Sequence, residues 1–177
     1  MPEGPSIVIL KEEAQQFAGR KVISINGNSK IDQQRLAGLT VNSFKSWGKH
    51  FLICFDDFFV RIHFLMFGSY RINEKRDRPE RLSLAFDNGE LNFYSCSVRI
   101  VEGDADSVYD FSSDVLSDTW NREKAMEKLT LNADELVCDV LLDQDLFSGV
   151  GNIIKNEVLY RIRVHPESRT GSLPDEK

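Results

Sequence analysis

The sequence predicts an α+β protein, in which an N-terminal helix precedes an eight-stranded antiparallel β-sandwich and then a partial α-helical domain. The first helix is predicted over residues 5–17, and Gly19 is expected to end it. Its buried face is formed by four apolar residues at helical spacing: Ile7, Leu10, Ala14 and Phe17. Between residues 21 and 101, short runs rich in Val, Ile, Phe and Tyr recur between turn residues, which is typical of a sandwich or barrel.

Eight runs of this kind are predicted as strands, over residues 21–26, 40–47, 50–55, 58–64, 69–73, 81–86, 90–95 and 98–101. After Gly103 the strand pattern stops. The predicted organisation is therefore a domain over residues 1–103, a polar linker over 104–118 and a helical domain over 119–177.

Three helices are predicted in the C-terminal part, over residues 118–129, 132–144 and 151–162. Asn132 or Asp134 is expected to cap the second of them. The apolar face of that helix is predicted to contain Leu136, Val137, Val140 and Leu141. Near the end of the chain, Ser172 or Asp175 is a signal for the start of a further helix.

The 177-residue chain has a net charge of −6, but its charges are unevenly distributed. Residues 1–100 carry +3, residues 101–145 carry −10 and residues 146–177 carry +1, so a local basic surface is compatible with the acidic total. No apolar run is long enough for a membrane span and no signal-peptide pattern is visible, which predicts a cytoplasmic protein. Cys54, Cys96 and Cys138 form no CxxC pair, so we expect buried free thiols and no metal site or cofactor in this chain.

The chain begins MPEGP, which places a proline directly after the initiator methionine. Removal of Met1 leaves Pro2 with a free secondary amine, and an α-amino group has a pKa of about 7.7–8.0. A neutral amine of this kind can attack an electrophilic carbon and form an iminium, while the neighbouring Glu3 can transfer protons. The alternative interpretation is that this segment only starts a helix.

Three further segments carry candidate functional residues. In FSGVGNIIKNEVLY, Gly149 and Gly151 are expected to form a tight turn before a helix whose free backbone N–H groups suit a phosphate, although a plain helical corner has the same pattern. Lys49 follows a glycine at the start of a strand, where a solvated surface lysine is the alternative. The apolar run from Leu65 through Met66 to Phe67 precedes Gly68 and could enter a base stack if exposed, or form part of the core.

Together, and in this order, these segments resemble the formamidopyrimidine-DNA glycosylase/endonuclease VIII family over essentially the whole chain. The matching segments are MPEGP, GKHFL, HFLMFGSYR, SSDVLSD and LLDQDLFSGVGNIIKNEVLYRIRVHP, of which the last resembles the family's helix–two-turns–helix element. The resemblance implies a bifunctional DNA glycosylase and AP lyase of base excision repair that acts on damaged double-stranded DNA. It also implies a monomer located with the bacterial nucleoid in the cytoplasm.

The family resemblance implies a role for each matching residue. Pro2 is expected to be the nucleophile at C1′ of the damaged nucleotide and Glu3 the general acid/base, while Lys49 binds a phosphate beside the lesion and supports catalysis. The expected DNA contacts are made by Asn152, Leu65, Met66, Phe67, Arg99 and Lys155. Among these, Met66 and its two neighbours are expected to fill the space that the flipped nucleotide leaves.

Other residues indicate the branch of the family and depart from its pattern. MPEGP and the segment YSCS favour endonuclease VIII, and hence oxidised pyrimidines, over the branch that removes 8-oxoguanine. Ser6 replaces a usual glutamate, Leu65 replaces a polar void-filling residue, and Asp110 lies near the position of a DNA-contacting arginine. The family usually continues into a zinc finger or a zincless equivalent, so we expect the chain to be C-terminally truncated, with any zinc ion in the missing part.

Two rival hypotheses follow from these departures. The chain could be a degenerate, non-catalytic member of the same fold that binds DNA without cutting it, because helix–two-turns–helix elements also occur in proteins that only bind nucleic acid. It could also be a plain β-sandwich with an interaction tail. Covalent trapping by borohydride on an abasic duplex separates both from the enzyme.

Overall fold

The computed structural model describes residues 2–174, which form two compact units. The first, which we call the sheet unit, contains Pro2 and residues 6–46 and 50–109. The second, the helical unit, contains the chain from Asp110 onward together with two short segments from the N-terminal half, Glu3–Pro5 and Trp47–Lys49. The helical unit is therefore assembled from three separate parts of the sequence.

The sheet unit is built on one antiparallel sheet with the strand order β1-β5-β6-β4-β3-β2. The strands are β1 (Ser24–Asn26), β2 (Ser43–Trp47), β3 (His50–Cys54), β4 (Phe58–Ile72), β5 (Leu82–Phe86) and β6 (Gly89–Glu102). The predicted α+β class is confirmed, but the described residues contain six strands rather than eight. The predicted strands at 58–64 and 69–73 are both part of β4, and those at 90–95 and 98–101 are both part of β6.

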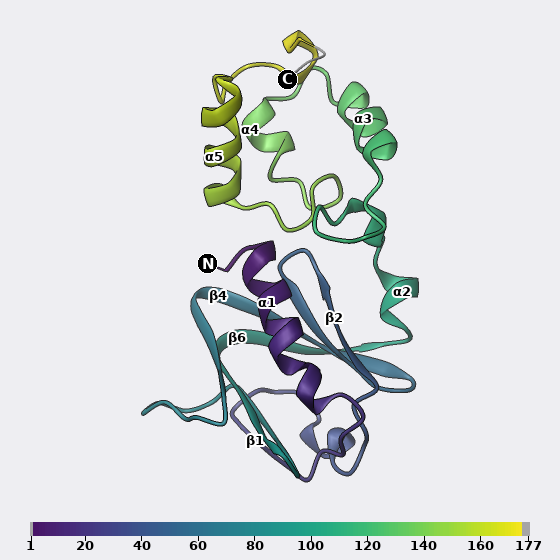
Figure 1. Ribbon diagram of the computed structural model, residues 1–177, viewed down its shortest axis with the longest axis vertical. Coiled ribbons are helices and arrows are strands. Elements are labelled where there is room, and N and C mark those ends of the chain that lie inside the picture. Colours follow the sequence, from purple (N-terminus) through teal and green to yellow (C-terminus); the bar gives the residue numbers. More distant parts are fainter. Residues whose placement is uncertain (1, 175–177) are drawn as a thin grey trace. The chain divides into compact units, whose positions relative to one another are not determined.

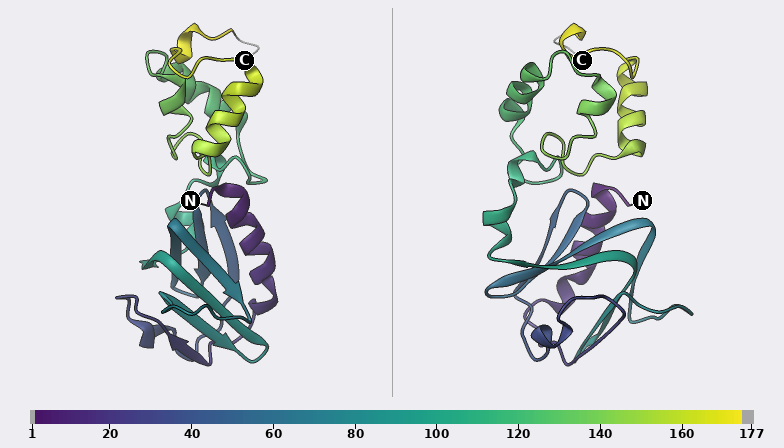
Figure 2. Two further views of the ribbon diagram at one scale, coloured as in Figure 1. Left: turned by 90° about the vertical axis from the view of Figure 1, so that its left-hand side faces the viewer. Right: turned by 180° about the vertical axis from the view of Figure 1, so that it is seen from behind.

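An irregularity in the pairing of β4 with β6 explains why each long strand gave two separate patterns. Phe64 pairs with Cys96 and Ser69 pairs with Tyr94, so residues 65–68 of β4 lie opposite Ser95 alone. Ser95 has a φ of 49°, which interrupts the extended backbone of β6 at the same place. Such a bulge bends both strands without ending them, and the two strands curve visibly in Figure 2.

Helix α1 (Gly4–Ala14) continues into a 3₁₀ turn at Gln15–Phe17, which confirms the predicted N-terminal helix. It lies along one face of the sheet (Figure 1). All four residues of the predicted apolar face belong to the core. Phe17 stacks on Phe86 of β5 with their ring centroids 4.7 Å apart. Full burial of a side chain of this size contributes about 1.5–3 kcal/mol, so this face anchors α1 to the sheet.

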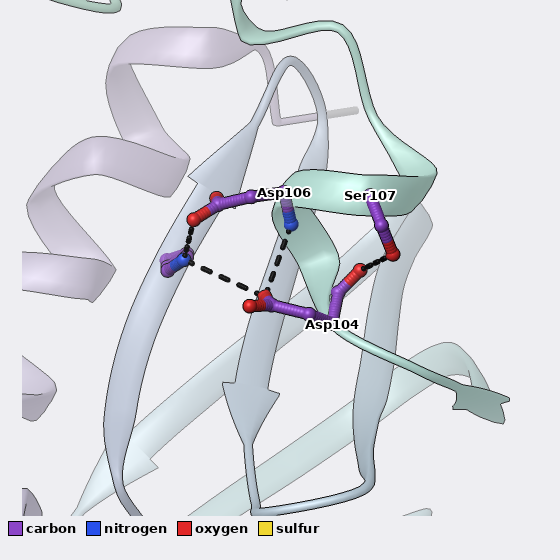
Figure 3. Close-up of polar contacts among 4 residues, drawn as sticks. Asp104, Asp106 and Ser107 are labelled. Atoms are coloured by element: carbon purple, nitrogen blue, oxygen red, sulfur yellow. Dashed lines mark hydrogen bonds and ion pairs between the residues drawn. The ribbon is translucent and has the colours of Figure 1, made fainter.

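The predicted polar linker begins with an ordered helix, α2 (Ala105–Val108). Asp104 caps it by accepting a hydrogen bond from the backbone N–H of Asp106, and the hydroxyl of Ser107 donates to the carbonyl of Asp104 (Figure 3). The ammonium of Lys45 on β2 lies 2.7 Å from a carboxylate oxygen of Asp106 and 3.8 Å from one of Asp104. These contacts attach α2 to the sheet, which local sequence pattern alone did not indicate.

The helical unit contains α3 (Arg122–Leu131), α4 (Val137–Val140) and α5 (Asn152–Ile162), with α4 drawn between the longer two in Figure 1. Short 3₁₀ turns lie at Phe111–Ser113 and Thr170–Ser172. Asn121 caps α3 by accepting a hydrogen bond from the N–H of Lys124, so the helix begins later than predicted. None of the described helices has the length and apolarity that a membrane span requires.

The predicted helix over 132–144 is wrong in extent, because only Val137–Val140 is helical. Neither predicted cap is used: Asn132 ends α3, and Leu136 precedes the first turn of α4. The backbone N–H of Val137 donates to the carbonyl of Ser168 (2.9 Å), and that of Cys138 donates to Pro166 (3.2 Å). These long-range hydrogen bonds take the place of the intrahelical bonds that an earlier start of the helix would require.

Several smaller predictions have mixed outcomes. Within the predicted apolar face, Val137 and Val140 are buried, whereas Leu136 and Leu141 are half-buried. Ser172 lies in a 3₁₀ turn and does not start an α-helix, and Asp175 lies outside the described residues. All three cysteines are free thiols; Cys54 and Cys96 are buried, and Cys138 is only half-buried.

Candidate functional site

A pocket of about 580 Å³ in the sheet unit has Pro2 in its wall. Ser6 and Glu13 of α1 and Tyr70 of β4 contribute polar groups to the same wall. The volume lies within the range of small-ligand sites, which are concave and contain a few oriented polar groups. The structure thus places the half-buried Pro2 beside a pocket whose volume suits a small organic group.

One carboxylate of this pocket has a fixed orientation. The hydroxyl of Tyr70 donates to Oε2 of Glu13 at 2.7 Å. Burial of the phenol, and after it this hydrogen bond, raises the pKa of Tyr70 to about 12, so the hydroxyl remains a donor at neutral pH. Neither residue was predicted from the sequence, because they lie 57 positions apart and no local pattern connects them.

Glu3 in the helical unit is buried, and its carboxylate accepts three backbone hydrogen bonds at the start of α5. Oε1 accepts from the N–H of Ile153 (2.8 Å), and Oε2 accepts from those of Ile154 (3.0 Å) and Gly151 (3.2 Å). These N–H groups have no partner within the helix, and the helix dipole favours an acidic group here. The start of α5 is therefore an anion site, and a residue of this chain occupies it.

This occupancy corrects the prediction that the turn before α5 presents free N–H groups to a phosphate. Gly149 has a φ of 97°, which favours glycine, and its carbonyl accepts a hydrogen bond from the N–H of Gly4 (2.9 Å). Gly151 has an ordinary extended conformation, but a Cβ there would lie 2.4 Å from the carboxyl group of Glu3. Glycine is therefore favoured at the two positions for different reasons: the positive φ of the turn at Gly149, and the space that the Glu3 carboxyl group occupies at Gly151.

Lys49 also belongs to the helical unit and follows a tight turn at Gly48, whose φ is 55°. The backbone N–H of Gly48 donates to Oδ2 of the buried Asp114 at 2.8 Å. Burial lowers the pKa of the half-buried Lys49 ammonium, and the negative charge of Glu3 partly opposes this effect. Glu3 and Lys49 are thus close enough in the helical unit to interact electrostatically.

The predicted DNA-contacting residues are accessible in the structure. Leu65, Met66 and Phe67, at the bulge of β4, are 51%, 72% and 78% exposed, so they do not form part of the core. Arg99 is exposed on β6. Their contacts with DNA remain predictions, but exposure is the condition that the insertion of apolar side chains requires.

Two other predicted contacts lie on α5. Asn152 is exposed, and its side-chain oxygen accepts a hydrogen bond from the ammonium of Lys155 at 3.1 Å. Both residues therefore lie on one accessible side of the first turn of the helix. The described residues contain no group of three or more His, Cys, Asp or Glu side chains that could hold a metal ion.

Asp110, one of the departures noted in the sequence, has a local structural role. Its carboxylate accepts hydrogen bonds from the hydroxyl (2.5 Å) and backbone N–H (3.0 Å) of Ser112, which lower the pKa of Asp110. Its carbonyl accepts from the indole N–H of Trp47 at 3.0 Å. Asp110 therefore caps the 3₁₀ turn and fixes Trp47 within the helical unit.

The chain matches two family models. The formamidopyrimidine-DNA glycosylase N-terminal domain matches residues 1–98, and the formamidopyrimidine-DNA glycosylase H2TH domain matches residues 111–177. The Bos taurus protein "Endonuclease 8-like 2" is 39% identical over 127 residues, which are 64% of this chain and 37% of that protein. "DNA-(apurinic or apyrimidinic site) lyase Nei2" of Mycolicibacterium smegmatis is 28% identical over 79% of this chain and 58% of its own length.

Solved structures share the fold. A viral DNA glycosylase matches 98% of this chain with a TM-score of 0.82 at 20% identity, over 75% of its own length. A wild-type Lactococcus lactis Fpg (MutM) in complex with DNA containing an oxidised pyrimidine matches 99% of this chain with a TM-score of 0.84 at 24% identity, over 73% of its length. The chain thus spans about three quarters of these structures and between about a third and three fifths of the two curated relatives.

Proposed function

The chain belongs to the formamidopyrimidine-DNA glycosylase family, and on this premise we propose that it is a bifunctional DNA glycosylase and AP lyase that removes oxidised bases from duplex DNA. The observation that carries the proposal is the position of Pro2 in the wall of a pocket of about 580 Å³ that also contains polar side chains. We favour oxidised pyrimidines, because MPEGP resembles endonuclease VIII and because the names of similar proteins include "Endonuclease 8-like 2".

In the proposed reaction, the neutral amine of Pro2 attacks C1′ of the damaged nucleotide. The bond from C1′ to the base breaks, and the base leaves with the electron pair and takes up a proton. The amine nitrogen then loses its proton, the bond from C1′ to O4′ breaks with its electron pair on O4′, and O4′ takes up a proton, which leaves an iminium between Pro2 and C1′. The secondary amine suits this step because an α-amino group is partly neutral near pH 7, unlike a lysine.

The iminium then acidifies C2′, and removal of a proton there breaks the bond from C3′ to its phosphate. A second elimination removes the proton at C4′ and breaks the bond from C5′ to its phosphate, which leaves with the electron pair. Water then hydrolyses the iminium and restores the amine of Pro2. Glu3 is the proposed proton carrier for these steps. Two carboxylate oxygens offer about four acceptor positions, of which the described backbone N–H groups use three, so Oε1 retains one position that can accept a proton.

The proposed roles of the remaining residues follow from charge and exposure. The ammonium of Lys49 binds a phosphate beside the lesion, and Asn152 and Lys155 contact the backbone of the duplex. Arg99 adds a further cation for the backbone. The exposed run from Leu65 to Phe67 enters the base stack where the damaged nucleotide has left it.

Borohydride trapping on a duplex with one abasic site tests this proposal, with intact-mass measurement to establish that Met1 has been removed. We expect a covalent adduct of the wild-type chain and its loss in a Pro2→Gly variant. A Lys49→Ala variant is expected to trap more slowly while it remains folded. Absence of an adduct from protein that starts at Pro2, or full trapping by Pro2→Gly, would refute the proposal.

One observation favours the rival function, a non-catalytic DNA-binding member of the family. Ser6 lines the pocket beside Pro2 where the family pattern has a glutamate, so this part of the wall lacks a carboxylate. A chain that binds abasic duplex with unchanged affinity in the Pro2→Gly variant, and that gives no adduct with either form, would support this alternative.

A further inference from the structure

We propose that Asp114 is a positioning residue for Lys49, and that it acts through the backbone of Gly48. The functional part of this inference rests on the proposed role of Lys49 as the phosphate-binding cation. Asp114 makes no contribution of its own to the reacting atoms in this proposal. Asp114 fixes the backbone position from which the Lys49 side chain extends.

The first observation is the burial and hydrogen bonding of the Asp114 carboxylate. The residue is only 3% exposed, and each of its oxygens accepts a backbone hydrogen bond. Oδ2 accepts from Gly48 at 2.8 Å and Oδ1 accepts from Leu116 at 2.9 Å. A buried carboxylate is costly unless it is hydrogen-bonded, so these two contacts define its orientation strongly.

The second observation is that the turn at Gly48 is also confined on its other side. A Cβ at Gly48 would lie 2.1 Å from Oγ of Ser148 and 2.8 Å from the backbone nitrogen of Gly149. The turn thus packs directly against the segment at 148–149 while Asp114 accepts its N–H. Its φ of 55° is unfavourable for other residues but open to glycine, and because glycine also adopts many other conformations, the surrounding contacts select this one.

The third observation is that the same segments also fix the start of the chain. The carbonyl of Ser113 accepts from the N–H of Ser148 (2.9 Å), and the carbonyl of Ser148 accepts from Val115 (3.3 Å). The carbonyl of Gly149 accepts from the N–H of Gly4 (2.9 Å). Residues 113–115 and 148–149 therefore form one hydrogen-bonded network, which also holds the backbone of Gly48, next to Lys49, and of Gly4, next to Glu3.

A fixed backbone matters for Lys49 because its side chain is a flexible four-carbon stem with a compact charge. Without a defined turn, the ammonium can extend into water instead of remaining half-buried near Glu3. Misplacement of a substrate-positioning group by about 1 Å can reduce a rate about 100-fold. Loss of the Asp114 contact is therefore expected to impair the function of a residue that it does not touch through its side chain.

The placement of Lys49 can be measured without any catalytic activity. In protein with ¹³C-methylated lysines, the pH titration of each ammonium is followed by NMR, and the Lys49 signal is assigned with a Lys49→Arg variant. We expect Lys49 to titrate below the ordinary value of about 10.4 in the wild type and near it in Asp114→Asn. The matched control is Asp118→Asn, an exposed aspartate on the same segment, which should leave the Lys49 signal unchanged. An unchanged Lys49 titration in folded Asp114→Asn would overturn the inference.

Rates of trapping on abasic duplex test the functional part through a cycle of Asp114→Asn, Lys49→Ala and the double variant. We expect Asp114→Asn to slow trapping by about 10- to 100-fold in the wild-type background and not to slow it further in Lys49→Ala. Losses that multiply in the double variant would show that Asp114 does not act through Lys49. Wild-type protein that forms no adduct would refute the proposed function, while the NMR titration would still decide the positioning.

A second variant covers the case in which Asp114→Asn does not fold, which circular dichroism detects. Gly48→Ala distorts the same turn from the side of Ser148 and leaves the carboxylate in place. It is expected to move the Lys49 titration in the same direction as the loss of Asp114. A folded Gly48→Ala protein with wild-type Lys49 behaviour would show that the turn does not position the lysine.

Discussion

Replacement of Gly151 by alanine should expel the Glu3 carboxylate from the start of α5. The added Cβ would lie 2.4 Å from the carboxyl carbon and from Oε1, and 2.8 Å from Cγ of Glu3. The backbone at Gly151 has φ −126° and ψ −167°, which alanine adopts without strain. The substitution therefore acts on Glu3 and not on the conformation of the turn.

The expected magnitude follows from the three hydrogen bonds that Glu3 accepts. Each contributes about 1 kcal/mol net to stability, which gives a loss of about 3 kcal/mol. Alanine also reduces the conformational entropy of the unfolded chain, which returns about 0.4–1 kcal/mol. We therefore expect Gly151→Ala to lower the free energy of unfolding by about 2 kcal/mol.

The assay is urea unfolding of Gly151→Ala in two backgrounds, wild type and Glu3→Ala. Truncation of Glu3 to alanine removes the three atoms nearest to the new Cβ, so the same substitution should become neutral or stabilise by about 0.4–1 kcal/mol. Hydrogen exchange gives an independent measure, because the amides of Ile153 and Ile154 should lose protection in either single variant. Equal destabilisation by Gly151→Ala in both backgrounds would refute the reasoning.

Two further predictions concern Lys49 and the exposed bulge of β4. Because burial lowers the folded-state pKa of Lys49, the unfolded state binds more protons between the folded and unfolded pKa values, so stability rises with pH there. Lys49→Met should thus stabilise the fold at neutral pH, and this gain in stability should decrease as the pH rises above the folded-state pKa of Lys49. The variant should also slow trapping. A gain in thermal stability that stays constant up to high pH would contradict the prediction. Met66→Ala should change stability by less than about 0.5 kcal/mol but weaken binding to abasic duplex in fluorescence anisotropy, whereas Ile9→Ala, a control that is 52% exposed on α1, should leave both unchanged.

Periodic patterns predicted the parts of the fold that depend on local burial. The apolar positions of α1 and the alternation in the β-strands were sufficient to indicate an N-terminal helix followed by an antiparallel sheet. The continuity of β4 was not predictable, because Gly68 lies at its bulge and interrupts the strand pattern. The late start of α4 was also hidden, because the N–H groups of Val137 and Cys138 donate to Ser168 and Pro166 and not to the preceding turn of a longer helix.

For the candidate site, the sequence indicated the segments but not their contacts. Glu3, Lys49 and Gly151 were each singled out, and the structure places all three in the helical unit. The sequence could not show that Glu3 accepts the hydrogen bonds of the N–H groups that were predicted to bind a phosphate, because 148 or more positions separate Glu3 from them. Asp114 received no role for a similar reason, since its partner Gly48 lies 66 positions away.

The hydrogen bonds of Glu3 have a consequence for how the protein is made. Their donors, Gly151, Ile153 and Ile154, are translated 148 to 151 residues after Glu3, and a ribosome adds roughly 5–20 residues per second. Roughly 8–30 s therefore pass between the synthesis of Glu3 and the synthesis of the residues that donate its hydrogen bonds. The hydrogen bonds that hold the Glu3 carboxylate can form only after the start of α5 has left the ribosome, so the proposed proton carrier reaches its native position late in synthesis, although it is the third residue of the chain.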